Sequence, residues 1–178
     1  KKRAVVVMCA DNGVVEEGVT QTGQEVTAIV AANMVKGETS VNNMAKCVNV
    51  DVIPVDIGIS RDMYIDGLIE KKLMYGTKNM TKEPAMTKYT AIEAVECGIK
   101  IVKDLKDKGY GIIATGEMGI GNTTTSSAIA AVLLDRNVEE VTGRGAGLSS
   151  EGLNRKICAI QKAIEKHQPD KEDVLDVL

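Results

Sequence analysis

Three short apolar runs rich in β-branched residues constrain the fold of this 178-residue chain more than any other feature. They lie at Ala4–Ala10, Val50–Ile57 and Tyr110–Thr115, and segments with helical periodicity separate them. Strands that alternate with helices favour a parallel sheet, because parallel neighbours must be joined by a crossover, which is usually a helix. We therefore predict an α/β fold in which helices flank a Rossmann-like parallel sheet in three layers.

Apolar side chains at three- and four-residue steps predict the helices. The stretch 24–47 forms one long helix or two abutting ones, since Gly37 could interrupt it. Thr87 is suited to cap a clear amphipathic helix that ends near Lys108. The other expectations are a buried helix at Asn122–Leu134, an amphipathic helix at Leu153–His167 capped by Ser149 or Ser150, a helical start after Pro169, and an irregular connection over 67–84.

Composition limits the class of protein. The length suits one domain over residues 1–178, and no apolar run approaches the roughly 20 residues that a membrane-spanning helix needs. A net charge of −3 and the absence of Phe and Trp give no basis for expecting nucleic-acid binding. We expect neither nucleic acid nor a membrane as a partner, and a cytoplasmic location. The chain ends at KEDVLDVL, inside a segment with helical periodicity. We therefore expect it to be a piece of a longer polypeptide, incomplete at its C-terminus.

Cysteine and histidine offer little catalytic chemistry. The four cysteines, Cys9, Cys47, Cys97 and Cys158, are far apart, and three lie in apolar segments, so we expect buried reduced thiols. The single His167 cannot build a histidine metal site or a Ser-His triad, and we interpret it as an exposed side chain.

Each predicted strand delivers a carboxylate at its carboxyl end, where an open parallel sheet binds its ligands. These residues are Asp11, Asp56 and Glu117. Three converging acids could bind a cation, hold sugar hydroxyls or transfer protons. For any one of them taken alone, we favour simple accumulation of polar residues at the solvent edge as the explanation. For the three together, we favour a functional role.

A glycine-rich stretch, GEMGIGNTTTSS, follows the third run. Its spacing resembles a P-loop, but Asn122 stands where the phosphate-clamping lysine is needed. The dinucleotide-binding motif is G-x-G-x-x-G. When it is counted from Gly119, Thr124 stands in place of the third glycine. Small residues at a helix start still expose backbone N–H groups to an anion, with Asn122, Thr123 and Thr124 adding donors. A phosphate monoester site that includes Gly121, or tight packing of a small-residue helix, both fit this pattern.

A second glycine cluster, Thr142–Leu148, carries Arg144 between glycines and precedes a helix that contains Lys156. The two cations are candidates for a second contact to an anion, although a flexible loop is the plainer interpretation. From the residues alone, we predict an α/β enzyme that acts on a phosphorylated small molecule, a nucleotide or a sugar phosphate.

With these motifs in view, the chain resembles the nicotinate-nucleotide:dimethylbenzimidazole phosphoribosyltransferases of cobalamin lower-ligand synthesis. The matching stretches cover nearly the whole chain and include EEGVTQ at 16–21, VDIGI at 55–59, GTKNM at 76–80, PAM at 84–86, GEMGIGNTT at 116–124 and TGRGAGL at 142–148. The resemblance implies transfer of 5-phosphoribose from nicotinate mononucleotide to 5,6-dimethylbenzimidazole or a related base, without a cofactor or metal, by a homodimer. The products are nicotinate and α-ribazole 5′-phosphate.

The resemblance also implies roles for residues. Glu117, Gly119, Asn122, Thr123 and Thr124 would line the nucleotide site with Gly145 and Lys156, and Thr22 would reach toward the base. Asn12 replaces an expected histidine, and Val30 stands where some members have a glutamine that contacts the base.

The family's principal catalytic glutamate has no counterpart here, so Glu117 is expected to be auxiliary and the chain alone to turn over little. The alternatives are a metal-dependent phosphohydrolase built on Asp11, Asp56 and Glu117, or a non-catalytic nucleotide-binding fragment.

Overall fold

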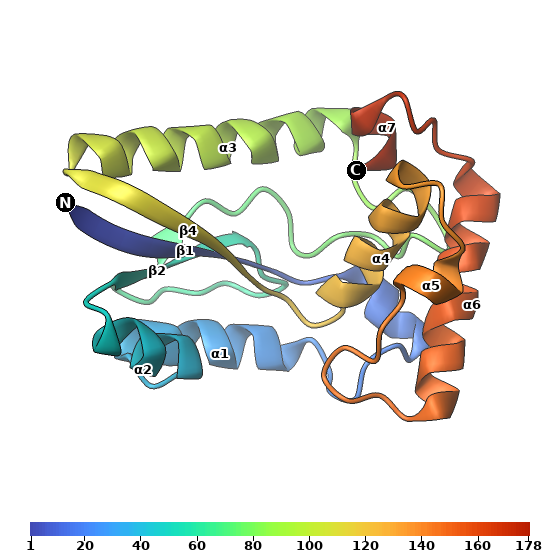
Figure 1. The fold of residues 1–178 in the computed structure, drawn as a ribbon, viewed down its shortest axis with the longest axis horizontal. Helices are drawn as coiled ribbons and strands as arrows, with labels where there is room; N and C mark the ends of the chain where they lie inside the picture. Colours follow the sequence, from blue (N-terminus) through green and yellow to red (C-terminus); the bar gives the residue numbers. More distant parts are fainter.

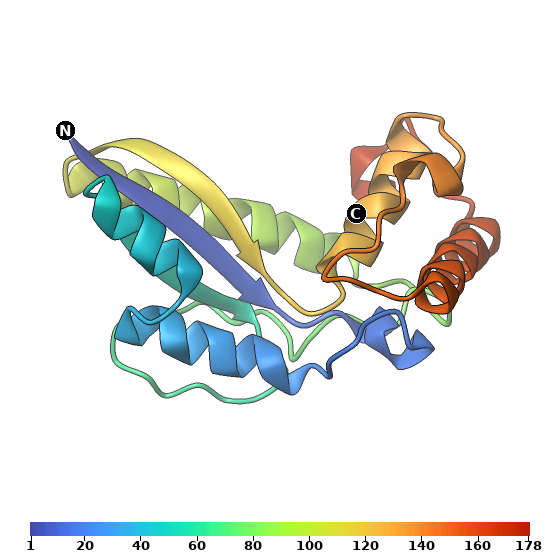
Figure 2. The same cartoon turned by 60° about the horizontal axis from the view of Figure 1, so that its bottom comes forward.

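The computed structural model describes all of residues 1–178 and consists of a parallel sheet with helices on both faces and a group of helices at one end (Figures 1 and 2). The elements in chain order are β1 Lys2–Ala10, the 3-10 helix η1 Gly13–Glu17, α1 Glu25–Lys36, α2 Ser40–Cys47, β2 Asp51–Gly58, β3 Ile69–Glu70, α3 Lys88–Asp107, β4 Tyr110–Met118, α4 Asn122–Leu133, α5 Val138–Val141, α6 Ser150–His167 and α7 Val174–Val177.

The four strands lie in the order β3-β2-β1-β4, and all three pairings are parallel. In Figure 1, α3 covers one face of the sheet, and α1 and α2 cover the other. The predicted three-layer α/β fold is therefore confirmed. The two-residue β3 was missed, because so short an extended segment inside an irregular connection leaves no period in the sequence.

Each face of the sheet has its own apolar cluster. On the α1 face, Val7 and Cys9 of β1 pack with Ala28 and Met34. On the α3 face, Val6 and Val55 pack with Ile101 and Leu105. Successive strand residues point to opposite faces, so the unbroken apolar run of β1 is buried on both sides, as expected for an inner parallel strand.

A third cluster lies beyond the carboxyl ends of the strands, where α6 packs against η1, α4 and α5. It joins Val14 and Val19 of the first loop to Ile160 of α6, which is fully buried. The cluster therefore fixes the helices that follow β4 against the loop that follows β1. The assignment of residues 1–178 to a single domain stays a prediction.

The expected helix at 24–47 is two helices. Gly37 ends α1 in the left-handed region, with φ of 80°, and Thr39 caps α2 by accepting a hydrogen bond from the backbone N–H of Asn42. Thr87 likewise caps α3, and Ser149 caps α6. These local predictions hold because caps depend on neighbouring residues only.

Three expectations about burial are wrong. Only Cys9 is buried, whereas Cys47 and Cys158 are exposed and Cys97 is half-buried, although all four are free thiols. The α4 helix buries only Thr124, Ser127 and Ala131, and its apolar end is exposed at Leu133. His167 is half-buried, and its Nε2 lies 2.8 Å from the carbonyl oxygen of Met80. Helical periodicity identifies an apolar side but does not indicate what covers it.

Candidate functional site: an anion-binding crevice at the end of the sheet

The chain order reverses between β1 and β4, because β2 and β3 extend the sheet on one side of β1 and β4 lies on the other. Open parallel sheets bind ligands at such a switch point, beyond the carboxyl ends of the strands. At this point Asp11 and Asn12 follow β1, and Glu117 lies near the end of β4, where it is in register with Met8. The region beyond the carboxyl ends of β1 and β4, next to the glycine-rich turn, is therefore the expected ligand crevice.

The glycine-rich turn is packed tightly against the first loop. A side chain at Gly119 would collide with the carbonyl oxygen of Ala10, and Gly121 has φ of 94° with the Cβ of Asn12 3.2 Å from where its own would lie. The Asn12 side chain donates to the carbonyl of Ile120 at 3.2 Å. These glycines allow the backbone to turn close to β1, so that α4 begins directly at the crevice.

Lys156 is the main charged group of the crevice. It comes from α6, is only 1% exposed, and its Nζ donates to the Thr123 hydroxyl at 2.8 Å and to the carbonyl of Gly143 at 3.0 Å. No carboxylate pairs with it, although buried ammonium groups normally have a charged partner. The first turn of α4 and the glycine loop at 143–147 therefore enclose an uncompensated positive charge.

Burial lowers the pKa of Lys156 below its usual value, because the charged form loses hydration. Two further hydroxyls, those of Thr124 and Thr142, are buried without a hydrogen-bond partner. The first flanks Thr123 in α4 and the second precedes Gly143, so both belong to the segments that contact Lys156. An anion bound here would gain a cation, hydroxyl donors and the positive end of a helix.

Gly145 completes this cradle. It has φ of 54°, and a Cβ placed on it would lie 2.8 Å from the Thr123 hydroxyl and 3.7 Å from the Lys156 Nζ. Any larger residue would therefore fill the space beside the ammonium group. Gln21, in the loop after β1, donates to the carbonyl of Gly147 and ties the two loops together.

Glu117 lies near the end of β4, six residues before Thr123. Partial desolvation raises its pKa above the usual value, and the neighbouring Asn122 side chain opposes the shift. A carboxyl group with a raised pKa accepts a proton more readily, and the auxiliary role of Glu117 in proton transfer that the resemblance implies stays a prediction.

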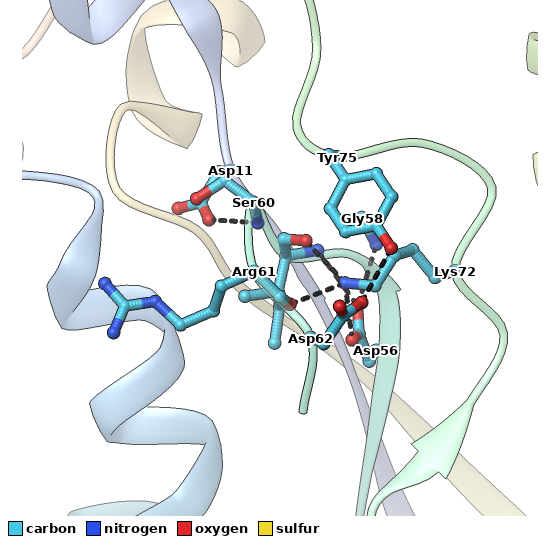
Figure 3. A network of polar contacts seen from close by, with 9 residues as sticks. Asp11, Asp56, Gly58, Ser60, Arg61, Asp62, Lys72 and Tyr75 are labelled. Atoms are coloured by element: carbon cyan, nitrogen blue, oxygen red, sulfur yellow. Dashed lines mark hydrogen bonds and ion pairs between the residues drawn. The ribbon is translucent and has the colours of Figure 1, made fainter. Parts of the chain in front are cut away.

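Asp56 belongs to a separate polar network, drawn in Figure 3. One carboxylate oxygen accepts from the backbone N–H groups of Gly58 at 3.1 Å and Ile59 at 2.9 Å. The other forms an ion pair with Lys72 at 2.9 Å, and Asp56 is 1% exposed. Lys72 also donates to the carbonyls of Ile59 and Arg61. These bonds hold the backbone of the loop after β2 in place. The Arg61 side chain extends away from the network.

Asp11 is bonded within the protein through one carboxylate oxygen, Oδ2, while its Oδ1 is buried without a hydrogen-bond partner. It is 1% exposed and accepts from the backbone N–H of Ser60 at 2.8 Å, which fastens the loop after β2 to the end of β1. The three predicted acids do not gather into a group that could hold a metal ion. Asp56 and Glu117 lie on strands separated by β1, roughly 10 Å apart at the spacing of neighbouring strands, and Asp56 is neutralised by Lys72. The prediction that the three acids form the metal site of a phosphohydrolase is therefore wrong.

Arg144 and Thr22 stand apart from the cradle in different ways. The Arg144 guanidinium donates to the carbonyl of Leu148 at 2.7 Å and to the Ser150 hydroxyl at 3.1 Å, so it holds its own loop in shape. Thr22 is exposed in the loop beside Gln21, and its carbonyl accepts from the hydroxyl of Thr20. A direct contact of either residue with a substrate stays a prediction.

Sequence reasoning missed several residues that shape the crevice. Asn12 is the anchor of the glycine turn, Thr27 of α1 accepts from the backbone N–H of Ile120 at 3.0 Å, and Lys72 neutralises Asp56. Val30 packs against the apolar cluster of the α1 face. Asn12 and Val30 were named from the family resemblance, but nothing in the sequence pointed to Thr27 or Lys72.

The parallel sheet, with a buried ammonium group that no carboxylate pairs beside the first turn of α4, defines an α/β protein with a candidate anion-binding site. None of its helices combines the length and the hydrophobicity that a crossing of the bilayer demands. The chain belongs to the phosphoribosyltransferase family DBI_PRT, whose model matches residues 1–178.

Several curated relatives are named nicotinate-nucleotide--dimethylbenzimidazole phosphoribosyltransferase. The protein of Acetivibrio thermocellus is 51% identical over 177 residues, which are 99% of this chain and 50% of the relative. That of Ruminiclostridium cellulolyticum is 48% identical over 178 residues, covering 100% of this chain and 51% of the relative. A crystal structure of CobT from Thermus thermophilus superposes with a TM-score of 0.90 at 38% identity, covering 93% of this chain and 50% of that one. The chain thus spans about half the length of these relatives.

Proposed function

We propose that this chain provides the phosphoribosyl-binding part of an enzyme that transfers 5-phosphoribose from nicotinate mononucleotide to 5,6-dimethylbenzimidazole or a related base. A ring nitrogen of the base attacks C1′ of the ribose, and the C1′–N bond to nicotinate breaks, with its electron pair leaving on nicotinate. The attack inverts the anomeric carbon and gives α-ribazole 5′-phosphate. The other ring nitrogen of the base then gives up its proton to a carboxylate.

The buried Lys156 carries this proposal. An ammonium group that is 1% exposed and has only neutral partners is costly to the protein unless an anion binds beside it. A phosphate monoester matches this arrangement, because it offers charge to Lys156 and acceptor oxygens to the hydroxyls of Thr123 and Thr124 and to the N-terminus of α4. Curated relatives over the whole chain bear the name of an enzyme whose substrate contains such a group.

We assign the roles accordingly. Lys156, Thr123, Thr124 and Gly145 hold the phosphate, while Asn122 and Gly119 place the ribose next to Glu117. Glu117 assists proton transfer, and the principal base comes from polypeptide that this chain does not contain. Asp11 and Asp56 support the floor of the crevice through Ser60 and Lys72.

A binding titration tests the proposal. The chain is titrated calorimetrically with nicotinate mononucleotide and with the corresponding riboside, which lacks the phosphate. We expect weak but saturable binding of the mononucleotide, binding of the riboside weaker by at least about tenfold, and little α-ribazole phosphate when the base is added. Absence of mononucleotide binding would refute the proposed function. Normal turnover by this chain alone would instead promote Glu117 to the principal base.

We also propose that the complete enzyme is a cytoplasmic homodimer that needs neither cofactor nor metal and binds no nucleic acid. The net charge of −3 supports the last point, since nucleic-acid binding depends on clustered basic residues. A sedimentation experiment at several protein concentrations tests the dimer.

A further inference from the structure

The glycine loop at 143–147 lies beside residues 18–24, the part of the first loop that leads into α1. Figures 1 and 2 both show the orange segment between α5 and α6 next to the blue segment between η1 and α1. Neither segment belongs to a helix or a strand. Because no regular element fixes their backbones, their placement depends on hydrogen bonds from side chains.

Both ends of the 18–24 segment are attached to the protein. At its start, the carbonyl of Gly18 accepts from the Nε of Arg155 in α6 at 3.2 Å. At its end, the side-chain amide of Gln24 donates to the carbonyl of Asn12 at 2.9 Å. The segment therefore begins at α6 and ends beside the glycine-rich turn, which Asn12 holds.

Gln21 connects the middle of this segment to the glycine loop. Its side-chain amide donates to the carbonyl of Gly147, which lies 126 positions later. No other hydrogen bond joins residues 20–23 to a distant part of the chain. Gln21 is also exposed, so it does not anchor the segment by packing. The two segments are therefore held together at this point by one side chain.

The glycine loop is connected to the phosphate cradle through its other end. The Nζ of Lys156 donates to the carbonyl of Gly143 and to the Thr123 hydroxyl, which uses two of its three donors. A bound phosphate would take the third donor and hold the ammonium group, and with it the Gly143 carbonyl, in one position. Three of the five loop residues are glycine, so the loop has much conformational freedom to lose.

We propose that Gln21 is a positioning residue: it transmits the ordering of the glycine loop by a bound phosphate to residues 18–24. The crevice then closes on the part of a mononucleotide that extends beyond its phosphate. A ligand that has already immobilised one segment lowers the entropy cost of ordering the other, so Gln21 itself needs no contact with the ligand. This inference rests on the proposed function, because the phosphate starts the ordering.

Hydrogen exchange measured by mass spectrometry on this chain tests the transmission. In the wild type, saturating nicotinate mononucleotide should slow amide exchange at least about fivefold both at 143–147 and at 20–24. Gln21→Met keeps a side chain of similar length but removes the amide donor. In this variant, we expect the protection to remain at 143–147 and to be lost at 20–24.

Calorimetry separates the transmission from a general loss of structure. Gln21→Met should raise the dissociation constant of the mononucleotide at least about fivefold and leave that of inorganic phosphate unchanged, because inorganic phosphate binds only in the cradle. Gln161→Met is the matched control, since it removes an exposed amide that donates to Glu139 at 2.7 Å, and it should change neither constant. Circular dichroism verifies that both variants are folded.

Three results would overturn the proposal: protection of 20–24 that persists in Gln21→Met, protection confined to 143–147 in the wild type, or an equal loss of affinity for inorganic phosphate and the mononucleotide in Gln21→Met. Failure of the proposed function gives a different result, because the mononucleotide would then protect neither segment in the wild type. That result would also remove the basis of the coupling.

Discussion

Replacing Lys156 by methionine tests the anion-binding crevice directly. Methionine is of similar length and apolar, so it fills the buried space but removes the ammonium group that donates to Thr123 and Gly143. A hydrogen bond to a charged group contributes about 1.5–3 kcal/mol, which corresponds to roughly tenfold to 150-fold in affinity. We therefore expect the dissociation constant of nicotinate mononucleotide to rise by a factor in this range.

The free energy of unfolding should respond much less than the affinity. Burial lowers the pKa of Lys156, which means that the protein bears a cost for keeping the group charged. Removing the amine relieves this cost but leaves the Thr123 hydroxyl and the Gly143 carbonyl without a donor. The two effects oppose each other, so urea unfolding should show a change within about 1 kcal/mol.

The pH dependence has a definite sign. Because its pKa is lowered in the free protein and a bound phosphate would raise it, binding takes up a proton once the pH exceeds the free-state pKa. The affinity of wild type should thus fall as the pH rises through that value. Stability without ligand should rise over the same interval, since the unfolded chain retains the proton up to a higher pH. Both trends should be absent in Lys156→Met.

Isothermal titration calorimetry with the mononucleotide and the riboside is the assay, and Lys162→Met, an exposed lysine in the same helix, is the matched control. The reasoning is refuted if Lys156→Met binds the mononucleotide as wild type does. It also fails if the affinity for the riboside falls equally, because the loss would then reflect a disturbed loop rather than a missing phosphate contact.

Three further predictions concern the scaffold of the crevice. Lys72→Met leaves the carboxylate of Asp56 buried and unpaired, so urea unfolding should show a loss of about 3–5 kcal/mol, whereas Lys82→Met, which breaks an exposed ion pair, should leave the midpoint unchanged. Gly119→Ala forces a Cβ into the carbonyl of Ala10, and calorimetry should show weaker mononucleotide binding; unchanged binding would contradict the packing of the turn. Thr87→Ala removes the cap of α3, and thermal unfolding should report a loss of about 1 kcal/mol, with Thr87→Ser retaining wild-type stability.

Local features of the fold could be read from the sequence because their causes are local. The three long strands and the cap at Thr87 were predicted correctly, because they depend on neighbouring residues. The break at Gly37 and the cap at Ser149 were each one of two alternatives that the sequence left open. The alternation of strands and helices also predicted the parallel sheet. The glycine-rich turn was recognised as a candidate anion site, although its spacing matched no standard motif.

Burial and pairing required the tertiary structure, because they depend on residues far apart in the chain. Asp56 looked like a substrate ligand until Lys72, sixteen positions later, proved to neutralise it. Asp11 likewise accepts a hydrogen bond from the backbone N–H of Ser60, 49 positions away. Conversely, the sequence offered Lys156 and Arg144 together as anion contacts. Only the burial of Lys156 beside Thr123, 33 positions away and without a carboxylate partner, distinguishes the two. By itself the sequence determined which elements form and which residues could bind an anion. The packing of α6 against α4 decided which of them face the crevice, since only packing removes a charge from water.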